Sequence, residues 1–325
     1  MGLCISKGSA EIYVEDDDCQ ESVVSYGISN SVSSLFSLEG NKGVNQDAAV
    51  LFHGYGTEDV TFCAVYDGHG KNGHRVSKLV RNRLLKLMLN LKEEFAKNKN
   101  SPSHVNEIKM WEEACMSAFR VMDKEIKLLD NFDCSLSGTT EVVVLRKGEH
   151  LLIANLGDSR AILGTMNDDG GMTAVKLTTD LKPSVPTEGD RIRRSNGRVL
   201  ALRDEPHIDR VWLPHEDSPG LAMSRSFGDL LLKNHGIISI PEVSFHHLTS
   251  KDHFLFLATD GVWDVMSNDE VATIVESSDT GAKAAECVVN AAVSKWRQKF
   301  PSSKRDDITA LCLFLADKTD DTISS

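Results

Sequence analysis

The stretch FCAVYDGHG, residues 62–70, joins a β-rich hydrophobic run to an aspartate, and two later stretches repeat this pattern: FLFLATDGVW (254–263) and KRDDITALCLFL (304–315). The aspartates are Asp67, Asp260 and Asp306, each at the end of its run and beside a glycine or a second acid. Buried carboxylates repel one another unless they are paired or bind a cation. If the three strand ends converge, their oxygens suit Mg²⁺ or Mn²⁺. The pattern therefore points toward metal-assisted hydrolysis.

The composition is typical of a soluble globular protein, because 41% of the 325 residues are hydrophobic and 26% are charged. The hydrophobic runs are far shorter than a membrane span, and residues 1–7 lack the apolar stretch of a secretory signal. The seven cysteines are scattered and form no Cys-x-x-Cys pair, which favours a reducing compartment and argues against structural zinc. The net charge of −12 argues against nucleic acid as a partner, and so against a metal-dependent nuclease.

Hydrophobic periodicity predicts an α+β fold with mainly antiparallel sheets covered by helices, because the helices fall in two groups between groups of strands. Residues 22–66 are expected to be β-structure with turns, and Ser267 with Glu270 to cap a helix. A loop is expected at 97–106. Residues 178–224 are expected to form a longer loop that contains a short helix at 188–195. The other expected helices span 74–95, 110–129 and 282–299, and the other expected strands span 139–145, 150–158, 160–164, 174–177, 253–260 and 308–316.

The segment VYDGHG (65–70) carries the sharpest chemical signal. Its two glycines let the backbone approach a ligand closely, so Gly68 can offer its carbonyl to a metal beside Asp67. His69 can act as a general acid near neutral pH. The alternative is a tight turn after a strand, with a histidine on the surface. A turn or cap is likewise the alternative for Asp260 and for Asp158 in NLGDSR (155–160).

Eight motifs in order resemble those of the metal-dependent serine/threonine protein phosphatases of type 2C, the PPM family, over about residues 25–316. The variant KGVNQD and the insertion RVWLP (210–214) resemble a plant branch. The motifs are KGVNQD (42–47), VYDGHG (65–70), SGTT (137–140), ANLGDSRA (154–161), LTTDLKP (177–183), GLAMSRSFGD (220–229), ATDGVWD (258–264) and DDIT (306–309).

The resemblance implies a central sandwich of two antiparallel β-sheets flanked by α-helices, with two Mn²⁺ or Mg²⁺ ions and a third held more loosely. It implies hydrolysis of phosphoserine and phosphothreonine on proteins, with His69 protonating the leaving oxygen and Lys42 meeting the phosphate. Phosphorylated proteins would be the partners and the chain a monomer. The metal site would comprise Asp67 as the bridging ligand, the Gly68 carbonyl, Asp260, Asp306, Asp158 for the third ion and Asp47 acting through water.

The chain departs from the family at two positions, where many members have arginine and glutamate. Lys42 can meet a phosphate only as a point charge, and Gln46 lacks a negative charge near the second metal. These departures leave open a second interpretation, a membrane-tethered pseudophosphatase or phosphoprotein-binding module. The stretch GRVLAL (197–202) lacks the tryptophan of the hormone-receptor-regulated plant branch, and Trp212 lies further on, so no such partnership is expected.

The N-terminus MGLCIS matches the pattern for myristoylation of Gly2, although a chance match is the alternative. One myristoyl chain binds a membrane only marginally, and the residues that follow Lys7 are acidic instead of basic. Palmitoylation of Cys4 is therefore the expected second anchor. These features predict a tail at 1–21, a catalytic domain at 22–317 and a C-terminal tail at 318–325. They place the protein at the cytoplasmic side of a membrane, the plasma membrane above all, or in the cytosol, with the nucleus left open.

Overall fold

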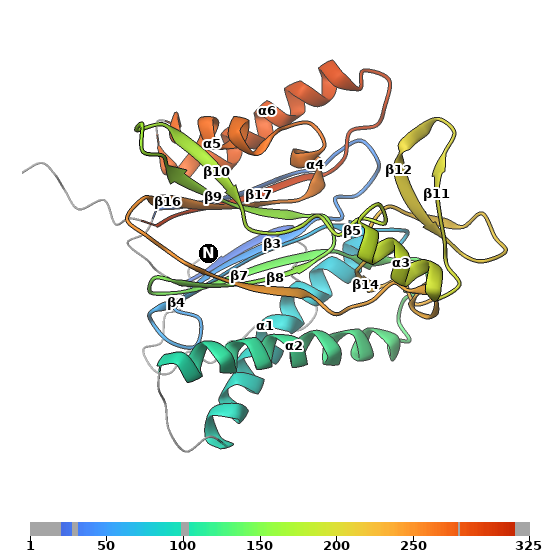
Figure 1. The fold of residues 1–325 in the computed structure, drawn as a ribbon, viewed down its shortest axis with the longest axis horizontal. Helices are drawn as coiled ribbons and strands as arrows, with labels where there is room; N and C mark the ends of the chain where they lie inside the picture. Colours follow the sequence, from blue (N-terminus) through green and yellow to red (C-terminus); the bar gives the residue numbers. More distant parts are fainter. Residues whose placement is uncertain (1–20, 28–31, 99–103, 279, 316–325) are drawn as a thin grey trace, which may run out of the picture.

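The computed structural model describes residues 21–27, 32–98, 104–278 and 280–315, and its centre is a pair of stacked β-sheets (Figure 1). The six-stranded sheet has the order β1-β3-β4-β7-β8-β15 and the five-stranded sheet the order β10-β9-β16-β17-β2. Neighbouring strands are antiparallel except β1 and β3, which are parallel. The strands of the first sheet are Val23–Tyr26, Ala48–His53, Val60–Tyr66, Glu141–Lys147, His150–Leu156 and Glu242–His247; those of the second are Met172–Lys176, Arg160–Met166, Asp252–Ala258, Ile308–Phe314 and Ser33–Leu38.

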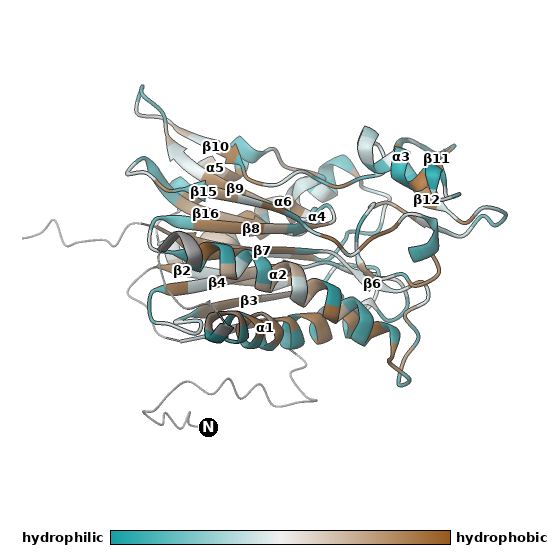
Figure 2. Cartoon of the chain, turned by 60° about the horizontal axis from the view of Figure 1, so that its bottom comes forward, coloured by the Kyte–Doolittle hydropathy of each residue, from teal (hydrophilic) through white to brown (hydrophobic). Residues whose placement is uncertain are grey.

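Both faces of the central strands are buried, which explains why their sequences are almost continuously hydrophobic. In β16, Leu255 and Leu257 point into the core between the sheets, whereas Phe254 and Phe256 point outward to the helices. Strand β4 alternates in the same way, with Val65 facing the other sheet. Figure 2 shows the hydrophobic residues that run along β7 and β8. This alternation fixes the register of the strands and holds their ends rigidly.

Helices cover the outer face of each sheet (Figure 1). The long helices α1 (Gly73–Asn98) and α2 (His104–Lys127) pack on the six-stranded sheet through Val80, Trp111 and Phe119, among others. The helices α4 (Asp260–Trp263), α5 (Asn268–Glu276) and α6 (Ala284–Lys299) pack on the five-stranded sheet. The expected fold class is confirmed, and Ser267 and Glu270 form the expected capping box. The helix expected at 110–129 begins earlier, at His104, and α1 runs to Asn98, so the loop expected at 97–106 is helical at 97–98 and at 104–106.

Residues 178–224 are more ordered than the expected loop. They contain α3 (Pro186–Arg194) and a three-stranded antiparallel sheet, β11 (Arg198–Leu202), β12 (Glu205–Trp212) and β13 (Pro219–Leu221). We call these four elements the side unit. It has its own small hydrophobic core around Ile192 and Val211, and it stands at one end of the sandwich (Figure 1). A second small sheet joins β5 (Gly68–His69), β6 (Gly138–Thr139) and β14 (Phe227–Gly228).

Candidate active site

Four aspartates gather where strands of both sheets end; Asp47 and Asp158 are buried, and Asp67 and Asp260 are partly buried. Asp67 follows β4, Asp158 follows β8 by one residue, and Asp260 is the first residue of α4, just after β16. Asp47 precedes β3 and accepts a hydrogen bond of 2.8 Å from the Thr259 hydroxyl. Asp306, two residues before β17, lies close enough to raise the pKa of Asp47, Asp67 and Asp260. The structure therefore brings the predicted acidic residues together from distant parts of the chain.

Burial is the main cause that raises the pKa of Asp67 well above its usual value, and the carboxylates of Asp47 and Asp306 raise it further. The pKa of Asp260 is raised for the same reasons, first by burial and then by Asp67. When these carboxyl groups are ionised they repel one another, so a positive charge bound among them would stabilise the cluster. A cluster of carboxylates with raised pKa values marks a candidate functional site.

The donor chemistry of the cluster fits a hard divalent cation. All the side chains offer oxygen, and Asp158 Oδ1 is buried without a hydrogen-bond donor among the described residues. Within the same described ranges, no three His, Cys, Asp or Glu side chains already stand as a complete cation site. The carboxylates are nevertheless close enough to raise one another's pKa.

His69 points toward Asp229, and its Nε2 lies 2.7 Å from Asp229 Oδ2. The small sheet β14-β6-β5 creates this pair, because Gly138 lies between the two side chains. A Cβ at Gly138 would stand 2.4 Å from Asp229 Oδ2 and 2.8 Å from His69 Nε2, so only glycine fits there. Burial lowers the pKa of His69, but the Asp229 carboxylate outweighs this effect and the net pKa is raised. The Asp229 carboxylate thus favours the protonated form of the imidazole.

Lys42 and Gln46 both lie at the site. The Lys42 ammonium contacts the Asp306 carboxylate; burial lowers the pKa of Lys42, but Asp306 and other carboxylates raise it on balance. The Gln46 amide donates to the Gly70 carbonyl at 2.8 Å, and its backbone N–H donates to Asp307 at 2.8 Å. Gln46 therefore stabilises the VYDGHG turn through this side-chain hydrogen bond. A glutamate carboxylate at this position could not donate it.

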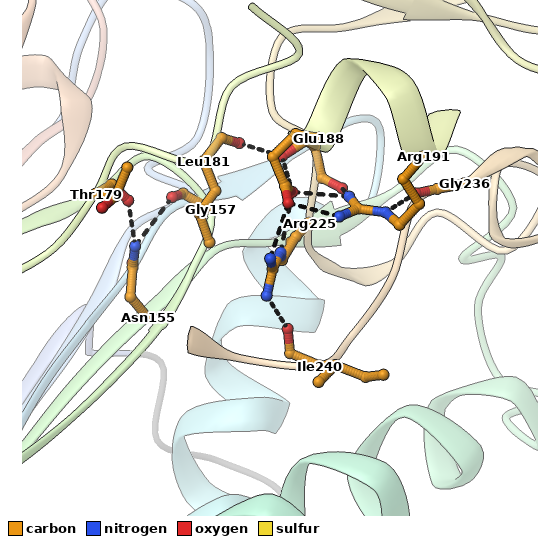
Figure 3. A network of polar contacts seen from close by, with 10 residues as sticks. Asn155, Gly157, Thr179, Leu181, Glu188, Arg191, Arg225, Gly236 and Ile240 are labelled. Carbon is orange, nitrogen blue, oxygen red and sulfur yellow. Dashed lines mark hydrogen bonds and ion pairs between the residues drawn. The ribbon is translucent and has the colours of Figure 1, made fainter. Parts of the chain in front are cut away.

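A network of charged side chains attaches the side unit to the sandwich (Figure 3). Glu188 of α3 is 2% exposed and accepts paired hydrogen bonds from Arg191 and from Arg225, at 2.6 to 3.0 Å. The Ser224 hydroxyl donates a further bond of 2.6 Å. Arg225 also donates to the carbonyl of Ile240, so the network links α3 to the segment that continues to Asp229.

A protein-family model described as protein phosphatase 2C matches residues 37–299. The chain belongs to the protein phosphatase 2C family. It is 51% identical over 330 residues to "Probable protein phosphatase 2C 72" of Arabidopsis thaliana, which covers 98% of this chain and 99% of that protein. It is 45% identical over 360 residues to "Probable protein phosphatase 2C 12" of Oryza sativa subsp. japonica, with 98% and 92% covered. The solved serine-threonine phosphatase 2C from Toxoplasma gondii has the same fold, with a TM-score of 0.78 at 24% identity over 87% of this chain and 94% of that one.

The resemblance seen in the sequence is therefore confirmed, and the chain is a phosphatase. Two further residues at the candidate site were not predicted from the sequence. Asp229 ends the motif GLAMSRSFGD, and only the fold shows that it meets His69, 160 residues earlier. Lys182, in LTTDLKP, lies 3.6 Å from Asp158 and 3.9 Å from Asp264. The motifs contain both residues, but their roles depend on long-range contacts.

The predicted lipidation sites Gly2 and Cys4, and the predicted tails apart from Glu21, lie outside the described residues. Among the helices that the structure describes, none is long and apolar enough to cross a membrane.

Proposed function

We propose that this phosphatase hydrolyses phosphoserine and phosphothreonine on proteins, with two Mn²⁺ or Mg²⁺ ions and a third held more loosely. The observation that carries the proposal is the set of buried and partly buried, mutually repelling carboxylates beside a histidine that is paired with an aspartate. Membership of the family and full-length similarity to plant relatives support it.

The ions would be held by Asp67, Asp260 and Asp306, with the Gly68 carbonyl and Asp158 as further ligands and Asp47 acting through water. When bound, divalent cations supply an acidified water as the nucleophile and neutralise the phosphate. The protein's own residues would position the ligands and supply the proton. The close packing of Gly68 fixes its carbonyl, because a Cβ there would lie 2.4 Å from the Gln46 carbonyl oxygen and 2.6 Å from that of Gly73.

His69 would donate a proton to the serine or threonine oxygen as it leaves. Asp229 favours the protonated imidazole and fixes its orientation through the 2.7 Å contact with Nε2. Asp229 is itself held by the Ser226 hydroxyl at 2.5 Å. Lys42, half exposed beside Asp306, is placed to meet a phosphate oxygen as a point charge.

The test is turnover of a phosphothreonine peptide by the purified protein in Mn²⁺, in Mg²⁺ and in excess chelator. We expect phosphate release that requires the metal, because all the proposed ligands are oxygens. The matched control is Asp67→Asn, which removes one of the carboxylates that would hold the ions. Binding of the peptide without turnover in saturating Mn²⁺ would reject the proposal and favour the phosphoprotein-binding interpretation, which the departures at Lys42 and Gln46 leave open.

A further inference from the structure

A pocket of about 200 Å³ lies beside the active site and outside the carboxylate cluster. Its lining includes Asn41, Trp296, Arg297, Phe300 and Arg305. Asn41 directly precedes Lys42, and Arg305 directly precedes Asp306, so two chain segments serve both the pocket and the site. The Asn41 backbone N–H donates to the Arg305 carbonyl at 2.9 Å and joins these segments. We call this feature the basic pocket.

The charge around the basic pocket is opposite to that of the whole protein. Five of the eleven residues 295–305 are lysine or arginine and none is acidic, although the chain carries 48 acidic and only 36 basic residues. Lys295 pairs with Glu270, but Arg297 is exposed and has no ion-pair partner within the described part of the chain. A local concentration of cations on an acidic protein favours an anionic partner at that place.

The walls of the basic pocket combine guanidinium groups with aromatic rings. The Trp296 and Phe300 rings lie 5.1 Å apart, and the indole N–H is already bonded to the Gly261 carbonyl. Arg305 donates from one terminal nitrogen to the Glu39 carbonyl at 2.6 Å, whereas its buried Nε has no acceptor among the described residues. The bond to Glu39 holds the Arg305 guanidinium at the wall of the pocket, where its positive charge favours an incoming carboxylate. The rings suit the methylene groups of a glutamate.

We propose that the basic pocket binds an acidic side chain of the substrate protein near the phosphorylated residue. The phosphatase would thus prefer phosphoserine or phosphothreonine segments that contain glutamate or aspartate. This inference rests on the proposed function, because the same polypeptide segment must reach both the carboxylate cluster and the basic pocket. The shared segments at Asn41–Lys42 and Arg305–Asp306 make this geometry available.

The experiment compares two phosphothreonine peptides that differ only in flanking residues, glutamates in one and glutamines in the other. The wild-type protein should show a higher kcat/KM for the glutamate peptide, and added salt should reduce the preference. Arg297→Glu should lower this preference about fivefold, the upper end expected for an exposed ion pair. Arg120→Glu reverses a matched exposed arginine on α2, in the opposite helical layer, and should keep the wild-type preference.

Equal kcat/KM for the two peptides with the wild-type protein, or an unchanged preference in Arg297→Glu, would overturn the inference. A preference that appears only after the acidic run at 15–18 is replaced by serines would also overturn it, by identifying this chain's own tail as the occupant. A failure of the proposed function is distinguishable, because the wild-type protein would then hydrolyse neither peptide nor p-nitrophenyl phosphate in Mn²⁺.

Discussion

Replacing Glu188 by glutamine should loosen the side unit from the sandwich. Glutamine keeps the size of the side chain but removes the charge that Arg191 and Arg225 both contact. The guanidinium groups of Arg191 and Arg225 would then face each other across the neutral glutamine amide. The NH₂ group of that amide would point toward one of their N–H donors, where it could form no hydrogen bond. The substitution therefore tests the charge network and leaves the packing of α3 almost unchanged.

The expected loss of stability in Glu188→Gln follows from the pKa of Glu188. Burial alone would raise this pKa, but the hydrogen bonds from Arg225, Arg191 and Ser224 outweigh it and lower the pKa from 4.5 to about 2. At about 1.4 kcal/mol for each pH unit, this difference corresponds to roughly 3 kcal/mol of folding free energy at pH 7. The loss expected when one partner of a buried ion pair is removed is of similar size, about 3–5 kcal/mol. Because the pKa is lowered on folding, the stabilisation is complete above pH 4.5 and disappears as the pH falls toward 2.

The assay is thermal unfolding at pH 7 and at decreasing pH. Glu188→Gln should lower Tm by about 6 °C at pH 7, at roughly 2 °C per kcal/mol for a chain of this size, and the difference from wild type should shrink below pH 4.5. Limited proteolysis should cut the side unit first. The control is Glu205→Gln, which removes the partner of Arg210 from a more exposed pair of the same side unit and should cost less than about 1 kcal/mol. Equal effects of the two substitutions, or a Glu188→Gln difference that does not depend on pH, would refute the reasoning.

Four further substitutions test the site and the tail. Asp67→Asn should abolish turnover in Mn²⁺ without lowering Tm in chelator, because it removes a repelled charge; full turnover would contradict the site assignment. Asp229→Asn should reduce kcat far more for a phosphothreonine peptide than for p-nitrophenyl phosphate, whose leaving group needs little protonation, and equal losses would remove Asp229 from the proton-transfer step. Gln46→Glu should lower the Mn²⁺ concentration for half-maximal activity but cost about 1 kcal/mol of stability in chelator, since the bond to Gly70 is lost; an unchanged Mn²⁺ requirement would argue against a role near the second ion. Gly2→Ala should move a C-terminally tagged protein from the membrane to the soluble fraction with peptide turnover unchanged, and a wild-type protein that is wholly soluble would reject the lipid anchor.

The sequence predicted the strands best where both of their faces are buried. Strands β4, β16 and β17 are buried on both faces, so their hydrophobic runs marked both the sandwich and the positions of Asp67, Asp260 and Asp306 at their ends. Strands β12 and β15 were not predicted, because most of their side chains are exposed or only partly buried and leave no hydrophobic pattern. Their strand pairing depends on backbone hydrogen bonds with neighbours that the local sequence does not identify.

In the candidate site, too, some features could be predicted from the sequence and others could not. The acidic residues could be proposed from their own motifs, because each lies at the end of a recognisable run. The partner of His69 could not, since β5, β6 and β14 have only two residues each and meet through contacts distant in sequence. The ion pair between Lys42 and Asp306 is equally remote, with 264 positions between the partners. The sequence thus indicates candidate groups, whereas their pairing requires the folded chain.

The pairing of β2 with β17 has a consequence for how the protein is synthesised. The Ser37 and Thr309 hydroxyls lie 2.7 Å apart across these strands but are separated by 272 positions in the chain. At about 5–20 residues per second on the ribosome, β2 waits roughly 15 to 55 s for its partner strand. Asp306 emerges only just before that partner. The growing chain therefore cannot complete the carboxylate cluster until β17 is made, so the proposed metal site forms only at the end of synthesis.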